Sequence, residues 1–452
     1  MVCESANMSD LKFQNLKING TKKFKGEIKV SGAKNSSLVL LAASLLASKE
    51  VNLANVPQLT DIEKMKHILT TLGAELSNDG DKLIIKSNKL HICELPYGLV
   101  NGLRASFFCI GALLTKLGEA TLALPGGCKI GKRPIEEHIK GLKALGANIE
   151  IKDGLVIARI NNPKKKLKGA RINLNCPSVG ATETLVMAAC LAEGTTTIEN
   201  AAREPEVQDL CCMLNKMGAK IFGAGQSKII IEGVKNLNGC SHKVIPDRIE
   251  AGTFLIAAAA TKSNITVSPV IPHHLDAVIE KLKECGSKLE IKGNAISIST
   301  KSIKAVSVET SPFPGFPTDL QAPFTALMSI AQGKSTISET IFENRMSHIE
   351  SLNQMGASIK VKNNIALIEG VKNLNGQFLT AHDLRSAAAI VIAALSAEGI
   401  SHIKGLEHLD RGYEDFECKL NNIGADVIRE FKQVNQLDLN SSESNKKDYQ
   451  AA

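Results

Sequence analysis

One local pattern recurs six times along the 452 residues of this chain. An amphipathic helix ends in an apolar residue, a glycine followed by Ala or Ser comes next, and a strand of alternating residues follows. The glycines of the six copies are Gly73, Gly146, Gly218, Gly286, Gly356 and Gly424, so the intervals are 73, 72, 68, 70 and 68 residues. Glycine is the residue expected in the left-handed cap that ends a helix. The regular spacing therefore predicts six copies of one helix and strand unit.

Alanine-rich helices that are apolar on every side alternate with these amphipathic ones. They begin near Ser37, Ala105, Glu183, Ala251, Ala322 and Arg385. A helix without a polar face is buried in a folded domain. The sequence E-G-V-K-N-L-N-G occurs at Glu232 and again at Glu369, which relates the third unit to the fifth. We therefore expect an α/β (α+β) protein with two domains, each made of three units whose sheets wrap around buried helices.

The limits of the two domains follow from the order of the units. We expect a break near Lys243 to Pro246 and a second crossover near Gly32 and Lys34. Residues 34–245 would then form the first three-unit domain, and residues 1–33 with 246–440 would form the second. Residues 441–452 are polar and contribute no core residues, so we expect a disordered tail.

The composition indicates which kinds of partner the protein can bind and in which cellular compartment it is found. The net charge of +8 suits small anions as well as nucleic acid, but 4% aromatic residues and no Trp leave few rings on which bases could stack. The eleven cysteines are scattered without a C-x-x-C pair, which argues against a disulfide framework and a zinc knuckle. No segment resembles a signal peptide or reaches the length of a membrane span. We expect a cytoplasmic protein with no nucleic acid partner and no membrane insertion.

The stretch Leu124–Pro134 reads L-P-G-G-C-K-I-G-K-R-P. Its glycines and bracketing prolines disfavour a stable helix or strand, so we expect a mobile loop. The loop carries Cys128 with Lys129, Lys132 and Arg133, and neighbouring cations favour the thiolate form of a cysteine. Arg133 offers paired donors that suit a phosphate or a carboxylate. The loop is a candidate lid with one reactive group over an anionic substrate, and a surface turn with solvated lysines is the alternative.

Polar and charged residues stand at the start of each Ala-rich helix. Ser, Thr, Asp and Asn there can cap free N–H groups, but a cation at the positive end of a helix dipole is unfavourable. If the six helix starts face one cleft, their N–H groups and cations would form an anion site. A surface salt bridge is the alternative for any single residue. In chain order the helix-start residues are Lys34-Asn35, Arg104, Ser178 to Thr182, Asp247-Arg248, Thr318-Asp319, and Asp383 with Arg385.

Three further charged clusters follow the strands that come after buried helices. They are Ala202–Glu206, Ile341–Arg345 and Asp410–Glu414, and the unit order places them at the same end as the helix starts. Arg345 and Arg411 therefore join Lys34 and Arg133 as candidate clamps for a highly charged substrate. His273 and His274 lack the spacing of a metal site, so we expect no metal.

With these features in view, the chain resembles the enolpyruvyl transferases from about Phe24 to Ile428. The resemblance rests on ten motifs distributed over both predicted domains. They are V-S-G-A-K-N at Val30, L-R-A-S at Leu103, the loop at Leu124, S-V-G-A-T at Ser178, E-N-A-A-R-E-P-E at Glu199, P-D-R-I-E at Pro246, F-P-T-D at Phe316, E-T-I-F-E-N-R at Glu339, D-L-R at Asp383 and D-R-G-Y-E at Asp410. The branch that acts on shikimate 3-phosphate shares the fold but is not expected to carry the cysteine loop. Cys176 stands where related sequences often have a lysine.

The resemblance implies a two-domain inside-out α/β barrel and a transferase without a cofactor. Its substrates would be phosphoenolpyruvate and UDP-N-acetylglucosamine, joined at the sugar 3-hydroxyl by addition and elimination with release of phosphate. This is the first committed step of peptidoglycan synthesis. The implied catalytic residues are Cys128 as general acid, Asp319 as candidate base, Lys34 and Arg411. The cysteine is also the thiol that fosfomycin alkylates in the family.

The resemblance also implies a set of binding residues. Lys34, Arg133 and Arg411 would hold the phosphate of phosphoenolpyruvate, and Arg345 with Arg385 would help with its carboxylate. The positions that match the UDP-sugar site are Asn35, Arg104, Ser178, Val179, Gly180, Asp319 and Ile341, and Asp383 is a further candidate for substrate binding.

Two alternatives stay open at this point. A carboxyvinyl transferase with another acceptor would release phosphate without UDP-N-acetylglucosamine. A nucleic-acid-binding repeat protein would bind RNA or DNA in a salt-dependent manner and would not turn over phosphoenolpyruvate.

Overall fold

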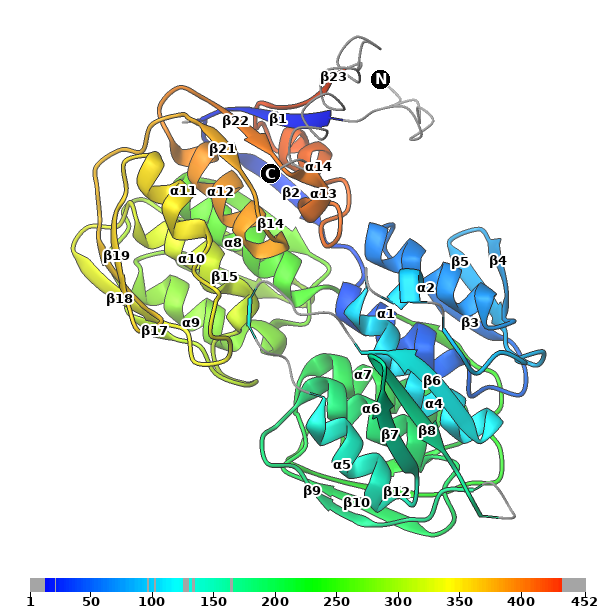
Figure 1. Ribbon diagram of the computed structural model, residues 1–452. Helices are drawn as coiled ribbons and strands as arrows, with labels where there is room; N and C mark the ends of the chain where they lie inside the picture. Colours follow the sequence, from blue (N-terminus) through cyan, green and yellow to red (C-terminus); the bar gives the residue numbers. More distant parts are fainter. Residues whose placement is uncertain are drawn as a thin grey trace, which may run out of the picture.

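The computed structural model describes residues 13–20, 22–95, 97–100, 103–124, 130–131, 135–162 and 166–432. Cys128, Arg133 and the tail 441–452 lie outside the described residues, so the expectations for the loop thiol, that arginine and the tail remain predictions. The described chain forms two lobes that are joined near the middle of the molecule (Figure 1).

Short strands form the outer layer of the first lobe. The strands are β3 (Val51–Ala54), β4 (Glu75–Asp79), β5 (Lys82–Lys86), β6 (Glu119–Ala123), β7 (Asn148–Lys152), β8 (Leu155–Arg159), β9 (Arg171–Asn173), β10 (Thr195–Glu199), β11 (Lys220–Phe222), β12 (Lys228–Glu232) and β13 (Ser241–Lys243). Their sheets have the orders β13-β3-β5-β4, β6-β8-β7 and β11-β12-β10-β9. Beside β6, a parallel bridge between Glu94 and Thr121 takes the place of a fourth strand. Each sheet thus contains one parallel pair and two antiparallel pairs of segments.

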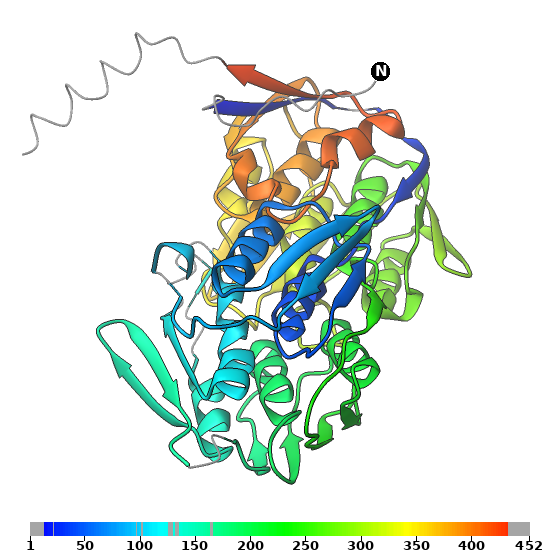
Figure 2. The same ribbon diagram turned by 90° about the vertical axis from the view of Figure 1, so that its right-hand side faces the viewer.

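The second lobe repeats this arrangement. Its strands are β1 (Phe13–Asn19), β2 (Lys25–Lys29), β14 (Asn264–Ser268), β15 (Lys288–Lys292), β16 (Ala295–Ser299), β17 (Val308–Glu309), β18 (Lys334–Ser338), β19 (Ser358–Lys362), β20 (Ile365–Glu369), β21 (Phe378–Thr380), β22 (Ile400–Lys404) and β23 (Val427–Lys432). The sheet orders are β21-β22-β1-β23, β15-β16-β14-β2 and β17-β18-β20-β19. The first described strand, β1, pairs with both β22 and β23, so the two ends of the described chain meet in one sheet (Figure 2).

The helices alternate between buried and outer positions, as the sequence predicts. The buried helices are α1 (Lys34–Ser44), α4 (Cys109–Leu117), α6 (Val179–Ala189), α8 (Arg248–Ala260), α10 (Gln321–Met328) and α12 (Leu384–Ser396). The outer helices are α2 (Thr60–Thr71), α5 (Glu136–Ala144), α7 (Pro205–Lys216), α9 (Asp276–Glu284), α11 (His348–Gln354) and α14 (Phe416–Asn422). Shorter helical pieces are α3 (Tyr97–Val100), η1 (Arg104–Phe108), η2 (Pro272–Leu275), η3 (Thr318–Leu320) and α13 (Leu406–Leu409).

The glycines of the repeat adopt the conformation that the sequence predicts. All six have a positive φ, between 94° and 102°, directly after an outer helix. A side chain is strained in this left-handed region, so glycine is the residue that lets each helix stop and a strand begin. The sixfold unit of the sequence is therefore confirmed as the repeat of the fold.

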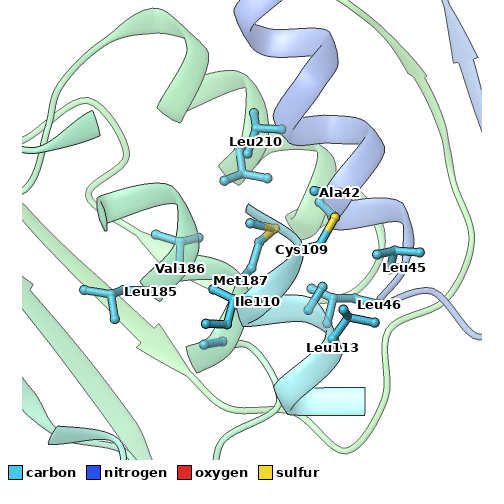
Figure 3. Close-up of a cluster of buried hydrophobic side chains, with 14 of the residues drawn as sticks. Ala42, Leu45, Leu46, Cys109, Ile110, Leu113, Leu185, Val186, Met187 and Leu210 are labelled. Carbon is cyan, nitrogen blue, oxygen red and sulfur yellow. The ribbon is translucent and has the colours of Figure 1, made fainter. Parts of the chain in front are cut away.

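The buried helices form the core of each lobe. In the first lobe α1, α4 and α6 bring their apolar side chains together (Figure 3), and Leu45, Leu113 and Val186 have no exposed surface. In the second lobe α8, α10 and α12 contact one another. Burying a Leu or Val side chain contributes roughly 1.5–3 kcal/mol, so these helices account for a large part of the stability of each lobe. The expected two-domain α/β architecture with sheets around buried helices is confirmed.

Two crossing segments connect the lobes. Gly32 forms an antiparallel bridge with Pro246, the Ala33 N–H donates to the Ile245 carbonyl at 2.8 Å, and the Asp247 N–H donates to the Ser31 carbonyl at 2.9 Å. One continuous apolar cluster runs from Ala33 to Val244, and the other combines residues 16–30 with residues 249–427. We propose that the domain limits lie at this paired crossing, as the sequence suggests. Among the described residues, no helix combines the length and the apolar character needed to cross a membrane.

Candidate active site

The starts of several buried helices meet at the junction of the lobes. Lys34 is the first residue of α1, Asp319 lies in η3 just before α10, and Arg385 lies in the first turn of α12. Electrostatic interactions connect Lys34 with Arg385, Asp319 and Arg411. Four residues that are far apart in the sequence therefore share one charged site. They are Lys34, Asp319, Arg385 and Arg411, and the repeat pattern predicts that they lie at the same end of their units.

A buried carboxylate joins two of the predicted phosphate-binding cations. Asp61, in the first turn of α2, accepts from the Lys34 Nζ at 3.3 Å and from the Arg411 Nε at 2.9 Å. The Asp61 side chain is 3% exposed and Lys34 11%, whereas Arg411 is 38% exposed. Arg411 belongs to the second lobe and Asp61 to the first. The carboxylate thus links the lobes and leaves part of the Arg411 side chain exposed.

Burial and charge act in opposite directions on this group. Burial is the largest effect on Lys34 and lowers the pKa of its ammonium group, while Asp61 acts to raise it. Burial alone would raise the pKa of Asp61, but Lys34 and Arg411 outweigh it and hold that pKa below its usual value. The carboxylate therefore stays ionised and supports the protonated lysine.

A second carboxylate is bound by two arginines. Asp319 accepts from the Arg345 Nη2 at 2.6 Å through one oxygen and from the Arg385 Nη2 at 2.7 Å through the other. Arg345 and Arg385 are buried, and the Asp319 side chain is 24% exposed. Burial disfavours its charge, but Arg385 and Arg345 outweigh that effect and hold the pKa of Asp319 well below its usual range. Both oxygens accept hydrogen bonds from the arginines, so Asp319 is a weak base in this arrangement.

Each arginine of this group has additional support. The Arg345 Nη1 donates to the Thr318 hydroxyl at 2.8 Å, and the Arg345 guanidinium carbon lies 5.1 Å from the centre of the Phe342 ring. The Arg385 Nη1 lies 3.3 Å from the Tyr413 hydroxyl, and the Arg385 guanidinium carbon lies 5.7 Å from the centre of that ring. Aromatic faces attract guanidinium groups, so the rings help to hold both planes in place.

Two of the predicted UDP-sugar residues, Arg104 and Gly180, lie near a buried histidine. His138 of α5 interacts electrostatically with Arg104, and a Cβ at Gly180 would lie 3.2 Å from the His138 Cε1. The His138 Nδ1 lies 3.1 Å from the Thr184 hydroxyl. Burial, with Arg104 as a second cause, lowers the pKa of His138 to about 3, so the ring is neutral. Ser178 caps α6 through the Ala181 N–H at 3.3 Å and remains partly exposed, as does its neighbour Val179.

The other predicted residues occupy varied positions. Asn35 is the exposed residue of the otherwise buried α1, and Ile341 is 36% exposed. Asp383 caps α12 by accepting from the Arg385 and Ser386 N–H groups, and its other oxygen accepts from the Ser347 hydroxyl at 2.7 Å. The geometry thus gives Asp383 a structural contact for each oxygen.

A contact near the predicted loop joins it to the second lobe. The Asn344 N–H donates to the Ile130 carbonyl at 2.9 Å. Gly131 has a φ of 140°, and a Cβ added there would lie 2.1 Å from the Glu343 Oε2. The described part of the loop therefore lies directly against the Ile341–Arg345 cluster.

A third set of ionic contacts crosses the junction beside this site. Arg248, at the start of α8, donates to both oxygens of Glu206 at 3.0 and 3.2 Å, and the Phe313 N–H donates to the Glu204 Oε1 at 3.3 Å. Burial raises the pKa of Glu204, and it raises the pKa of Glu183 well above its usual value, with Glu206 as a further cause. The cation at the start of α8 is thus explained by an acidic cluster of the other lobe.

Asp61 and His138 were not among the residues that the sequence singled out. Asp61 stands in T-D-I-E at the start of a helix, where an acid is expected simply to favour the helix dipole. His138 lies in an amphipathic helix, where it is buried with the centre of the Phe107 ring 5.1 Å away. Neither residue has a local signal that separates it from ordinary structural positions.

Comparison with known proteins adds evidence from sequence and fold. The profile of the family described as EPSP synthase (3-phosphoshikimate 1-carboxyvinyltransferase) matches residues 18–420. The UDP-N-acetylglucosamine 1-carboxyvinyltransferase of Prochlorococcus marinus strain MIT 9312 is 66% identical over 431 residues, which cover 95% of this chain and 94% of that protein. The protein of the same name from strain MIT 9515 is 68% identical over 430 residues, with the same coverages.

Solved structures support the same fold. The enolpyruvyl transferase NikO from Streptomyces tendae has a TM-score of 0.84 at 24% identity, and the match covers 93% of this chain and 99% of that chain. EPSP synthase from Acinetobacter baumannii has a TM-score of 0.72 at 20% identity, with 93% and 100% covered. At these identities the structures establish the architecture, and the close sequence relatives carry the more specific comparison.

Proposed function

This chain belongs to the EPSP synthase family, and we propose that it transfers the enolpyruvyl group of phosphoenolpyruvate to the 3-hydroxyl of UDP-N-acetylglucosamine. The identity of 66% over 95% of the chain with a protein named for this reaction is the observation that carries the proposal. Phosphate is the second product. The reaction is the first committed step of peptidoglycan synthesis. We assign the protein to the cytoplasm, because a chain with eleven scattered cysteines suits a reducing compartment.

The two groups of cations have the charge that phosphoenolpyruvate requires. We assign Lys34 and Arg411, with Arg133, to its phosphate, and Arg345 and Arg385 to its carboxylate. The distances of Lys34 and Arg411 to a shared Asp61 support a joint role for these two cations. Arginine pairs well with a planar carboxylate because its donors match the geometry of the two oxygens.

The acceptor substrate is assigned to the neighbouring surface. The residues proposed to line the UDP-sugar are Asn35, Arg104, Ser178, Val179, Gly180, Asp319 and Ile341, with Asp383 as a further candidate. Their support is the family resemblance, together with the position of Arg104 and Gly180 beside His138. Cys176, which stands where relatives often have a lysine, is exposed two residues before Ser178.

The reaction needs an acid on one side of the enol and a base on the other. Cys128 donates a proton to the methylene carbon, which makes the neighbouring carbon electrophilic. The sugar hydroxyl attacks that carbon and gives its proton to Asp319. The tetrahedral intermediate then expels phosphate, which takes up the hydroxyl proton from Asp319. The new methyl group returns a proton to the Cys128 thiolate, which restores the double bond. A positioned acid or base contributes roughly 10² to 10⁴ in rate, and alignment in a closed site supplies the remainder.

A coupled phosphate-release assay tests the function and the role of the loop cysteine. The wild-type protein should release phosphate only when both substrates are present, and fosfomycin should block it. Cys128→Ala should lower kcat at neutral pH by at least about 10² because the proton donor is lost. Cys212→Ala, which removes an exposed thiol of α7, is the matched control and should retain activity.

Two outcomes would redirect the assignment. Release with shikimate 3-phosphate, but not with UDP-N-acetylglucosamine, would identify the other branch of the family. Wild-type rates in Cys128→Ala would remove the cysteine from the mechanism while leaving the reaction class intact.

A further inference from the structure

Each of the two acids at the junction balances a pair of cations. Asp61 contacts Lys34 and Arg411, and Asp319 contacts Arg345 and Arg385. Under the proposed function these four cations bind the two anionic groups of phosphoenolpyruvate. The protein therefore contains one internal counter-ion for each substrate anion.

The exposed fractions distinguish the two acids. Asp61 is 3% exposed while its partner Arg411 is 38% exposed, so a phosphate can reach the guanidinium without displacing the acid. In the other group the side chains of Arg345 and Arg385 are only 6% and 7% exposed, whereas the side chain of Asp319 is 24% exposed. Asp319 is therefore the exposed member of this group, and the two arginines have little surface of their own open to an incoming carboxylate.

The supporting contacts indicate which partner can move. Arg345 is held by the Thr318 hydroxyl and the Phe342 ring, and Arg385 is held by Tyr413. Both oxygens of Asp319 are bound by the arginines themselves. If another carboxylate took those donors, the arginines would retain their other contacts and the Asp319 side chain would be released.

We propose that Asp319 occupies the arginine donors that bind the substrate carboxylate. The substrate carboxylate displaces Asp319 from Arg345 and Arg385, and the released Asp319 becomes available to the acceptor hydroxyl. This inference rests on the proposed function and adds a regulatory step to the reaction. The base would be occupied in the absence of phosphoenolpyruvate and released in its presence. The acceptor hydroxyl would then meet a free carboxylate only when the electrophile is already bound.

The charges around Asp319 agree with this exchange. Arg385 and Arg345 hold its pKa well below the usual range, and Lys34 and Arg248 also interact with it electrostatically. Loss of the two direct contacts raises the pKa and thus the basicity of the carboxylate. The cations that remain nearby keep it ionised, which a hydrogen-bond acceptor for the hydroxyl requires.

The test compares ligand affinity in Asp319→Asn and wild-type protein by calorimetric titration without the acceptor. If Asp319 competes with the substrate carboxylate, the variant should bind phosphoenolpyruvate about tenfold more tightly, because hydrogen bonds to charged groups are strong. Inorganic phosphate, which lacks a carboxylate, should bind both proteins within about twofold. Asp61→Asn is the matched control, because it removes an acid from the same site but should not tighten phosphoenolpyruvate binding.

The outcomes separate this inference from the proposed function. The exchange would be overturned if Asp319→Asn bound phosphoenolpyruvate with wild-type affinity. It would also be overturned if Asp319→Asn gained equally in affinity for inorganic phosphate, or if Asp61→Asn gained equally in affinity for phosphoenolpyruvate, because either result would indicate a general effect of charge. The phosphate-release assay on wild-type protein tests the function independently.

If Asp319→Asn does not fold, infrared spectra of wild-type protein with isotope-labelled aspartate supply the test. Phosphoenolpyruvate should then shift a carboxylate band that phosphate leaves in place, and no shift would overturn the inference.

Discussion

A buried carboxylate, Asp61, supports the protonated form of the candidate catalytic lysine. Lys34 lies among groups that oppose its protonation, namely its apolar surroundings and the cations Arg385 and Arg411. Asp61 lies 3.3 Å from its ammonium group and is the largest influence in the opposite direction. A lysine bound to phosphate must carry its proton, so the acid is as important to the site as the cation that it supports.

We predict that Asp61→Asn shifts the alkaline limit of activity. The pKa of Lys34 is already lowered by burial, and loss of the Asp61 charge lowers it further. Deprotonation then occurs at a lower pH, so kcat/KM for phosphoenolpyruvate should begin to fall at lower pH than in the wild-type protein. The measurement is a pH profile with saturating UDP-N-acetylglucosamine.

Asp79→Asn provides the control for this profile. Asp79 is an exposed acid of β4, so its replacement makes the same change in net charge away from the junction. A profile of Asp61→Asn that coincides with that of Asp79→Asn would show that Asp61 has no special effect on Lys34.

Helix α1 illustrates how an element can be held from outside. The residue before it, Ala33, offers no side-chain cap, and the Lys34 N–H instead donates to the Asp247 carboxylate at 3.1 Å. The Ser36 hydroxyl donates to Asp209 of α7, which also accepts from the His242 Nε2 at 2.8 Å. The first turn of α1 therefore depends on two acids that lie far along the chain.

We predict that Ser36→Ala reduces activity more than its loss of stability explains. The change removes the link between the first turn and Asp209, so Lys34 and Asn35 lose part of their support. A small misplacement of a binding group can cost a large factor in rate, and we expect kcat/KM for phosphoenolpyruvate to fall about tenfold.

Ser44→Ala is the matched control on the same helix. Ser44 is buried, and its hydroxyl donates to the Leu41 carbonyl at 2.6 Å, so the variant also loses one buried hydrogen bond. It lies at the end of α1 away from Lys34. Equal kinetic losses in the two variants at similar melting temperatures would contradict a positioning role for Asp209.

The molecule as a whole brings its lobes together through several separate contacts. Arg248 pairs with Glu206, Arg411 pairs with Asp61, and the Asn344 N–H donates to the Ile130 carbonyl. The first two join charged groups of opposite lobes, and the third attaches the described part of the loop to the second lobe. The paired crossing at Gly32 and Pro246 is the covalent connection between the lobes.

We predict that UDP-N-acetylglucosamine makes the protein more compact in solution. The sugar nucleotide would contact residues of both lobes, so its binding energy favours closure. Small-angle scattering with and without this ligand measures the change in radius of gyration. Gly131→Ala should reduce the compaction, because its Cβ would collide with Glu343 and its φ of 140° disfavours a side chain.

Gly80→Ala serves as the control for backbone strain. Gly80 also has a positive φ, of 59°, but a Cβ there meets no atom within 4 Å. Compaction that is equal in the wild-type protein and Gly131→Ala would argue against a role for the Gly131 contact in closure.

Much of this architecture could be predicted from local features. The six cap glycines and the apolar helices are encoded in periodicity and residue type, and these act over a few neighbours. The residues at the helix starts were identified in the same way, because Lys34 and Arg385 are unusual at the positive end of a helix. Asp61 and His138 escaped notice because an acid or a histidine is ordinary at its local position.

The amino-acid sequence alone specified the repeat unit, the division into buried and outer helices, and the charged residues at the helix starts. Only the tertiary structure decided how those charges are paired. Asp61 and Arg411 are separated by 350 residues, and Asp319 could have met either set of cations as far as the local pattern is concerned. The physical reason is that helix and strand formation depends on near neighbours, whereas an ion pair depends on how whole lobes pack and exclude water.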